Sequence, residues 1–455
     1  MADIWTAREA IAAVVDGGRF TELPDAAPEV PHRTDASGES DGPIGWPGYG
    51  QSLARAEEHT GERESVVCGT GSIGGTDVVV VSFEFGFLGG SLGERTGDRL
   101  EAAYTVARER RRPLVSLIAT GGSRMQEGMR ALAQLQRVAR QSALLRGSGV
   151  PQLAVLRDPT TGGGWATLGA GADVILALPG AQVGFAGSRV RPPGAHPGAY
   201  TAEGQLAAGQ IDAVVRREDV RDSLAQWLRH LTAAPWDGPP EPPGSLAPYA
   251  NHSHTPTGWE TVLRARSPER PRADAYLTAY FDRVQEISGD RCGGTDPGMR
   301  CGFGLRRGRS IAYAAQCGTA TLPAGYRTAA RLVRLAGRLG VPVLTLIDTP
   351  GAANDAEAER AGAGAAIADL FGAMATVRVP ATTLLIGEGG SGGALALAAP
   401  GNLWATHDSY FSVIAPEAAA AILKRAPDRI PETAGQLRLG PWDLVDLGIA
   451  RGVVS

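Results

Sequence analysis

Two glycine clusters hold the residues of this chain that could do chemistry. The first is Thr160-Thr-Gly-Gly-Gly164, with Gly121-Gly122 upstream of it, and the second is Gly389-Gly-Ser-Gly-Gly-Ala394. Where glycines open a helix, backbone N–H groups lack partners and a ligand oxygen can approach them closely. The helix dipole favours negative charge at the same place. The clusters therefore predict sites that stabilise an oxyanion, such as a thioester carbonyl turning into an enolate.

Other interpretations of these residues stay open. The glycines could simply close strand–helix corners. Arg124 could bind a carboxylate or phosphate of a ligand, or it could bridge to Glu127. Glu388 could act as an acid or base, or accept a structural hydrogen bond. The chain has no P-loop lysine motif and no zinc-binding histidine pair, so neither of those sites competes.

The two clusters repeat at one spacing. The run that starts at Pro113 recurs at Pro342, and Gly163 of the first cluster corresponds to Gly392 of the second. The two separations are equal (342 − 113 and 392 − 163), and we call this common separation the repeat offset. Two ungapped matches at the same spacing predict two copies of one fold.

The elements that must position the glycines are buried strands. Apolar runs at 113–119 and 342–347 are typical of buried parallel strands, and helical patterns follow at 124–146 and 357–376. This alternation predicts an α/β fold with crossover helices. The second half also predicts a helix over 273–287.

The length of 455 residues favours two domains, for which we expect bounds of 1–236 and 259–455 around a proline-rich linker at 237–258. The net charge of −4 gives no general sign of nucleic-acid or membrane-surface binding. The four cysteines form no CxxC pair, so we expect reduced thiols and no metal site. No signal peptide or long apolar span is evident, and we expect a cytoplasmic protein.

The glycine motifs resemble a known family. The strings Gly121-Gly-Ser-Arg-Met-Gln-Glu-Gly128 and Gly387-Glu-Gly-Gly-Ser-Gly-Gly-Ala394 are similar to those of the carboxyltransferase component of biotin-dependent acyl-CoA carboxylases. The resemblance is to the bacterial acetyl-CoA carboxylase type, with its β and α subunits fused in one chain. It implies a tandem duplication of the crotonase (ClpP-like) β-β-α superhelix fold.

The resemblance also implies a reaction: transfer of a carboxyl group from carboxybiotin to the α-carbon of a short acyl-CoA, most simply acetyl-CoA giving malonyl-CoA. The biotin ureido anion would take the α-proton, so no side-chain base is required. The chain has no biotinylation motif, so biotin would arrive on a separate biotin carboxyl carrier protein that works with a biotin carboxylase. A homo-oligomer with active sites between N and C halves is implied as well.

The family pattern assigns residues in three groups. The catalytic glycines are Gly121, Gly122, Gly163, Gly164, Gly392 and Gly393. The acyl-CoA side comprises Phe87, Gly89, Gly90, Arg124, Phe185, Ala186, Gly187 and Arg189. The biotin side comprises Gly351, Ala352, Gly389, Gly390 and Ala394.

The chain departs from the family pattern at 314–323 and 352–355. These departures leave open the acyl chain length and the use of biotin. The alternative function is a biotin-independent decarboxylase of a malonyl-type thioester that uses the same oxyanion sites. A non-catalytic scaffold is a third interpretation, which the two intact glycine clusters disfavour.

Overall fold

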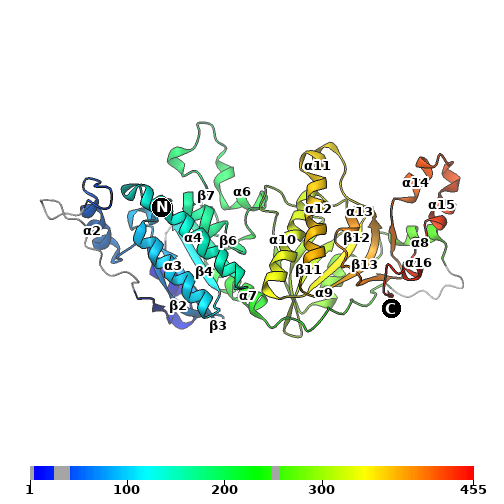
Figure 1. The fold of residues 1–455 in the computed structure, drawn as a ribbon, viewed down its shortest axis with the longest axis horizontal. Helices are drawn as coiled ribbons and strands as arrows, with labels where there is room; N and C mark the ends of the chain where they lie inside the picture. The colour runs from blue at the N-terminus through cyan, green and yellow to red at the C-terminus, as the bar shows by residue number, and fades with distance from the viewer. Residues whose placement is uncertain (1–4, 25–40, 248–255) are drawn as a thin grey trace. The chain divides into compact units, whose positions relative to one another are not determined.

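The computed structural model describes residues 5–24, 41–247 and 256–455. The chain forms two compact units, Met1–Thr232 and Ala233–Ser455, and each is described by itself (Figure 1). Residues 248–255 of the expected linker lie outside the described part, and the domain bounds given above stay a prediction.

The first unit is built on an eight-stranded sheet in the order β1-β2-β3-β4-β5-β6-β8, with β7 paired to β5. Strands β2 and β3 form an antiparallel hairpin, and β3 to β6 run parallel. Its strands are β1 (Thr21–Glu22), β2 (Val66–Ile73), β3 (Thr76–Phe83), β4 (Leu114–Thr120), β5 (Gln152–Thr161), β6 (Val174–Ala177), β7 (Val183–Gly184) and β8 (Ala213–Val214). Its α-helices are α1 (Ala7–Val14), α2 (Tyr49–Thr60), α3 (Glu94–Glu109), α4 (Met129–Gly147), α5 (Gly162–Gly164), α6 (Ala202–Ala207) and α7 (Val220–Thr232).

The second unit repeats this sheet in the order β9-β10-β11-β12-β13-β14-β16, with β15 paired to β13. Its strands are β9 (Arg283–Ile287), β10 (Met299–Arg306), β11 (Arg309–Gln316), β12 (Val343–Thr349), β13 (Ala381–Gly390), β14 (Leu403–Thr406), β15 (Tyr410–Ser412) and β16 (Val453–Val454). Its α-helices are α8 (Gly258–Ala265), α9 (Ala273–Tyr280), α10 (Pro323–Leu339), α11 (Ala356–Arg360), α12 (Ala363–Thr376), α13 (Ser391–Leu395), α14 (Pro416–Ile422), α15 (Ile430–Gln436) and α16 (Pro441–Asp446).

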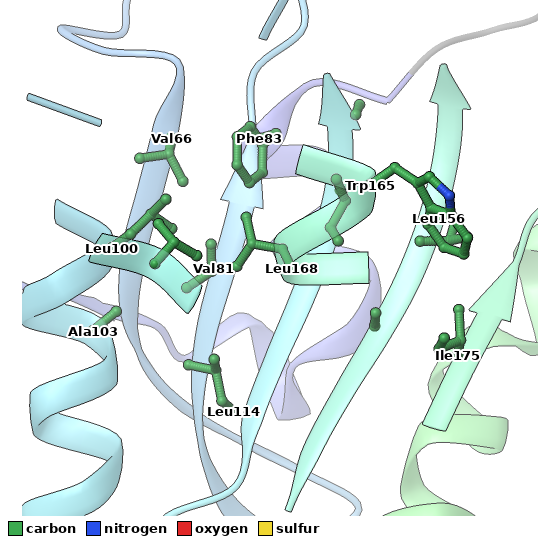
Figure 2. Close-up of a cluster of buried hydrophobic side chains, with 14 of the residues drawn as sticks. Val66, Val81, Phe83, Leu100, Ala103, Leu114, Leu156, Trp165, Leu168 and Ile175 are labelled. Carbon is green, nitrogen blue, oxygen red and sulfur yellow. The ribbon is translucent and has the colours of Figure 1, made fainter. Parts of the chain in front are cut away.

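Helices cover the sheet because each has an apolar stripe. In α3, Leu100, Ala103, Tyr104 and Ala107 are buried at three- and four-residue spacing, and the helix packs against α4, β2 and β3. Figure 2 shows this core, where Leu100 and Ala103 lie with Val66, Val81 and other apolar side chains of the sheet. All seven residues of β4 are buried, as predicted for a parallel strand covered on both faces.

The duplication extends to individual strands and hydrogen bonds. Strands β4, β5 and β6 reappear as β12, β13 and β14 at the repeat offset. The N–H of Leu92 donates to the carbonyl of Gly122 at 2.8 Å, and the corresponding N–H of Thr321 donates to Gly351 at 3.0 Å. The two units are therefore copies of one fold at the level of the backbone.

One predicted helix is wrong. The pattern over 273–287 is helical only as far as Tyr280, because Phe281 adopts an extended backbone (φ −108°, ψ 140°). Residues 283–287 instead form β9, which pairs antiparallel with β10. The pairing partner lies later in the chain, so tertiary structure overrides the local helical pattern. The predicted helix over 357–376 also breaks into α11 and α12 around Gly362, whose φ is +80°.

No helix within the described ranges is long and apolar enough to cross a membrane.

Candidate active site

The first glycine turn follows β4. The N–H of Gly121 donates to the carbonyl of Gly89 at 2.8 Å, and the N–H of Gly122 donates to Thr120 Oγ1 at 3.1 Å. Both amides are therefore used inside the chain. The catalytic role expected of Gly121 and Gly122 stays a prediction, and in this structure the turn takes its shape from these two hydrogen bonds.

The free donors of the first unit lie at the neighbouring turn, where β5 runs into α5. No hydrogen bond among the described residues uses the N–H of Gly163 or Gly164. The preceding residue, Gly162, has a φ of +64° and donates to the carbonyl of Phe185 at 3.1 Å. A Cβ at Gly163 would lie 2.4 Å from Leu135, so only glycine fits there without a shift.

The second unit builds the same turns. Gly351 donates to Thr349 Oγ1 at 3.1 Å, as Gly122 does to Thr120. The N–H groups of Gly392 and Gly393, at the start of α13, take part in none of the hydrogen bonds of the described chain. Ser391 repeats the left-handed backbone of Gly162 with a φ of +57°, although it carries a side chain. Such conformations are strained in non-glycine residues and concentrate at functional sites.

Three of the predicted acyl-CoA residues lie at the first turn or at the strand end that leads into it: Gly89, Gly90 and Phe185. Gly89 accepts from Gly121, and Gly90 packs so closely that a Cβ would lie 2.1 Å from the carbonyl oxygen of Ala119. Phe185 reaches the turn through its carbonyl, and its side chain is exposed. Of the other five, Ala186 and Gly187 are half-buried and Arg189 is exposed.

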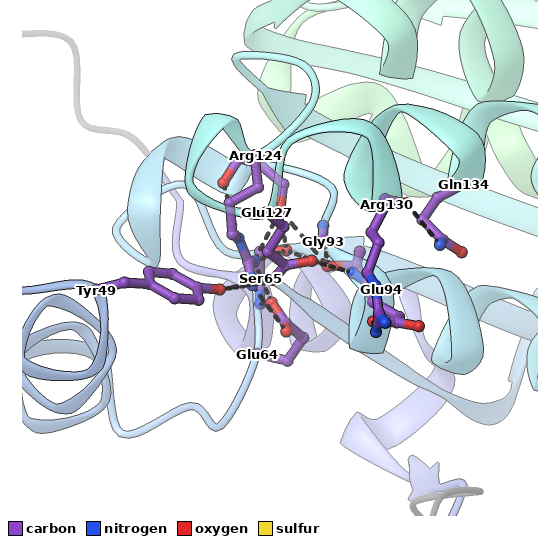
Figure 3. Close-up of polar contacts among 11 residues, drawn as sticks. Tyr49, Glu64, Ser65, Gly93, Glu94, Arg124, Glu127, Arg130 and Gln134 are labelled. Carbon is purple, nitrogen blue, oxygen red and sulfur yellow. Dashed lines mark hydrogen bonds and ion pairs between the residues drawn. The ribbon is translucent and has the colours of Figure 1, made fainter. Parts of the chain in front are cut away.

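Two predicted binding residues face inward. The ring of Phe87 is buried, and the guanidinium of Arg124 lies 5.6 Å from its centroid. Arg124 is itself only 1% exposed. Its nitrogens donate to Glu64, Glu127 and Tyr49, and also to Ser65 and to the hydroxyl and carbonyl of Ser91 (Figure 3).

The substrate-binding role of Arg124 stays a prediction, and in this structure its donors are used within the chain. The alternative, a bridge to Glu127 (3.2 Å), is confirmed. Burial alone would lower the pKa of Arg124, but the charge and hydrogen bonds of Glu64, together with the charges of Tyr49 and Glu127, outweigh burial and raise that pKa. Glu127 also accepts from the N–H of Glu94 at 2.5 Å, which ties this cluster to the start of α3.

Glu388, just before the second turn, has a structural role. Its carboxylate accepts from Arg266 Nε and from the hydroxyl of Tyr410, each at 2.8 Å. Its N–H donates to Asp348, which is fully buried and paired with Arg270. Of the two roles considered for Glu388, the structural hydrogen bond is the one observed.

The predicted biotin-side residues surround the second turn. A Cβ at Gly390 would lie 2.0 Å from the carbonyl oxygen of Pro350, and one at Gly389 would lie 2.6 Å from Phe411. Ala394 is fully buried in α13. Ala352 lies beside Gly393, since a Cβ at Gly393 would come within 2.5 Å of its nitrogen.

Comparison with known proteins decides the family. Residues 48–215 match the carboxyl transferase domain, and residues 250–455 match the acetyl co-enzyme A carboxylase carboxyltransferase-like family. The chain is 41% identical to the acetyl-coenzyme A carboxylase carboxyl transferase subunits beta/alpha of Salinispora arenicola, an alignment that covers 98% of this chain and 81% of that protein. The chain belongs to the acetyl-CoA carboxylase carboxyltransferase family.

Other relatives agree. This carboxyltransferase is 38% identical to the beta/alpha protein of Saccharopolyspora erythraea, over 90% of this chain and 74% of that one. It is 34% identical to a probable biotin-dependent acyl-coenzyme A carboxylase beta3 subunit of Mycobacterium bovis, an alignment that covers 89% of this chain and 83% of that protein. The predicted enzyme class, a carboxyltransferase of the biotin-dependent acyl-CoA carboxylases, is confirmed.

Solved structures confirm the predicted crotonase-type fold. A transcarboxylase 12S structure, described as a hexamer assembly with hydrolysed methylmalonyl-coenzyme A bound, superposes with a TM-score of 0.78 at 21% identity. That alignment covers 99% of the carboxyltransferase and 87% of the transcarboxylase chain. A single-chain, multi-domain long-chain acyl-CoA carboxylase superposes with a TM-score of 0.73 at 20% identity. That alignment covers 99% of this chain and 46% of the carboxylase chain.

Sequence reasoning missed some groups in the carboxyltransferase site. The N–H of Ser123, like that of its counterpart Ala352, takes part in none of the hydrogen bonds of the described residues. Glu64 and Tyr49, which hold Arg124, lie 60 and 75 residues before it. Only the Gly-Gly-Ser string itself could have pointed to Ser123, and no local signal connects Glu64 or Tyr49 to Arg124.

Proposed function

We propose that this carboxyltransferase moves a carboxyl group from carboxybiotin, carried on a separate protein, to the α-carbon of a short acyl-CoA. Acetyl-CoA, giving malonyl-CoA, is the substrate that the names of the relatives favour. The observation that carries the proposal is the duplicated pair of glycine turns, each with unused backbone N–H groups.

In the first unit, the N–H groups of Gly163 and Gly164 are the proposed donors to the thioester oxygen. Negative charge grows on that oxygen as the α-proton leaves, and fixed amide dipoles stabilise it without rearrangement. The loss of one such donor typically costs about 3–4 kcal/mol of transition-state stabilisation. Gly121 and Gly122 shape the same turn, because their own amides are already bonded.

In the second unit, the N–H groups of Gly392 and Gly393 are the proposed donors to the ureido oxygen of biotin. When bound, carboxybiotin supplies the carboxyl group and accepts the α-proton. The turn fits that role because its N–H groups are unused and because a Cβ at Gly392 would meet no atom within 4 Å, which leaves open space in front of it.

The proposal extends to partners and location. The carboxyltransferase would work with a biotin carboxylase and a biotin carboxyl carrier protein in the cytoplasm, with no resident metal. It would do so as a homo-oligomer, for which the hexamer of the structurally similar transcarboxylase is the support. Completion of each active site by N and C halves of different copies stays a prediction.

The experiment uses the full chain with malonyl-CoA, in the presence and absence of free biotin. We expect malonyl-CoA to lose its carboxyl group only when biotin is present, because biotin is the proposed acceptor of that group. Carbon dioxide release without biotin would instead favour the alternative, a biotin-independent decarboxylase. Forward assays with acetyl-CoA and propionyl-CoA, coupled to a biotin carboxylase, then compare the acyl chains.

A further inference from the structure

Polar side chains lie buried behind the glycine turn of the second unit. Gln316, at the end of β11, and Thr321 and Tyr326, near the start of α10, have no exposed surface. Gln316 Nε2 donates to Thr321 Oγ1 at 3.1 Å and to the carbonyl of Gly393 at 3.4 Å. The cluster therefore touches the backbone of one of the proposed donor residues directly.

Two atoms of this cluster have no hydrogen-bond partner among the described residues: the hydroxyl oxygen of Tyr326 and Oε1 of Gln316. The Tyr326 oxygen lies against the turn, since a Cβ at Gly393 would come within 2.6 Å of it. Burial raises the pKa of Tyr326 to about 12, and a contact with Thr321 partly offsets that rise without reaching hydrogen-bond geometry. The hydroxyl is therefore protonated at neutral pH and has a proton to donate.

The first unit lacks counterparts of Tyr326 and Thr321 behind its glycine turn. At the repeat offset, Gly97 occupies the place of Tyr326 and Leu92 that of Thr321. A Cβ at Gly164, the counterpart of Gly393, would meet methyl carbons of Thr120 at 2.4 Å and of Leu92 at 3.5 Å. The atoms directly behind Gly164 are thus methyl carbons, whereas a tyrosine hydroxyl lies behind Gly393; the polar group of the first unit is Gln134, whose Oε1 would lie 2.1 Å from a Cβ at Gly97.

Stability does not explain this difference. A buried polar group without a partner typically costs about 1–3 kcal/mol, and native proteins leave few of them unpaired. A water molecule needs two to four polar partners in a buried site, and the unpartnered hydroxyl of Tyr326 and Oε1 of Gln316 would be two of them.

We propose that Tyr326 is a positioning residue for the biotin-side turn. Its hydroxyl donates to a buried water, and that water donates in turn to Gln316 Oε1. Because Gln316 also holds the carbonyl of Gly393, the chain of hydrogen bonds fixes the peptide plane between Gly393 and Ala394, and through it the position of the adjoining peptide that carries the N–H of Gly393. This inference rests on the proposed function, in which those amides bind the ureido oxygen.

The test is Tyr326→Phe, which keeps the ring and removes only the hydroxyl. We expect biotin-dependent turnover of malonyl-CoA to fall by about ten- to a hundredfold, the scale of a misaligned catalytic group. The KM for malonyl-CoA and the midpoint of thermal unfolding should stay unchanged, because the acyl-CoA side and the packing are kept. Turnover within twofold of the wild type would overturn the proposal.

Tyr313→Phe is the matched control. Tyr313 is equally buried in the same unit, but its hydroxyl contacts Glu286 at 3.4 Å rather than the turn. We expect turnover in this variant to stay within twofold of the wild type. A loss equal to that of Tyr326→Phe would show a general effect of removing a buried hydroxyl and would overturn the assignment.

A second readout does not depend on activity. A high-resolution crystal structure of the wild type should show a water between Tyr326 and Gln316, and the Tyr326→Phe structure should lack it. If the wild type had no biotin-dependent turnover, the proposed function would fail, while the presence of this water would still support the hydrogen-bond chain. Absence of the water from the wild type would overturn the inference by itself.

Discussion

Arg124 and Glu64 form a buried ion pair in which both terminal nitrogens of the guanidinium donate to the carboxylate. Their side chains are only 1% and 2% exposed. Arg124 lies two residues after Gly122, so this pair anchors the segment that leaves the first glycine turn. The same guanidinium also holds Glu127, which caps the start of α3. The cluster thereby ties the turn to β2 and α3.

Replacement of Arg124 by methionine is expected to lower the free energy of unfolding by about 3–5 kcal/mol, because it leaves a buried carboxylate without its partner. Urea denaturation followed by circular dichroism measures the change. Arg130→Met is the control, since Arg130 pairs with Glu94 at the surface (61% and 44% exposed). That pair is expected to contribute at most about 1 kcal/mol. Equal losses in the two variants would contradict the role of the buried pair.

The same pair makes stability depend on pH. Burial alone would raise the pKa of Glu64, but the charge and hydrogen bonds of Arg124 outweigh it and lower the pKa below its ordinary value of 4.5. A lowered carboxyl pKa stabilises the fold above pH 4.5, and that contribution is lost as the pH falls through the folded-state pKa. The stability difference between wild type and Glu64→Gln should therefore be largest near neutral pH and shrink in acid. A constant difference in unfolding midpoints from pH 3 to pH 7 would rule this out.

Much of the fold could be predicted from the sequence, because the same apolar strand runs and glycine clusters occur in both units. The offset between Gly163 and Gly392 is also the offset between the strands that precede them. Partners that meet only after folding could not be predicted. The N–H of Gly121 donates to the carbonyl of Gly89, which lies 32 residues earlier in the chain, and no local sequence pattern predicts that hydrogen bond. The extended backbone after Tyr280 likewise depends on pairing of β9 with β10.

The two adjacent glycines of the first turn should differ in their tolerance of alanine. Gly122 has a φ of +110°, where a side chain is strained, although its Cβ would meet nothing closer than 3.5 Å. Gly122→Ala is expected to cost about 1–3 kcal/mol of stability from backbone strain alone. Gly121 has no such φ, and its Cβ would lie 3.4 Å from Gly89, so Gly121→Ala should change stability by less than about 1 kcal/mol. Thermal unfolding of both variants checks the contrast, which equal midpoints would refute.

The glycines of the second turn offer a sharper test of the proposed donors. A Cβ at Gly393 would lie 2.5 Å from the nitrogen of Ala352, so Gly393→Ala must displace backbone and should lower both turnover and the unfolding midpoint. A Cβ at Gly392 would meet no atom within 4 Å, so Gly392→Ala should leave the unfolding midpoint unchanged. Its methyl group would nevertheless occupy the space in front of the proposed donors, and biotin-dependent turnover should fall by about a hundredfold, as when one donor is lost. Full turnover in a stable Gly392→Ala protein would mean that the ligand oxygen does not bind in that space.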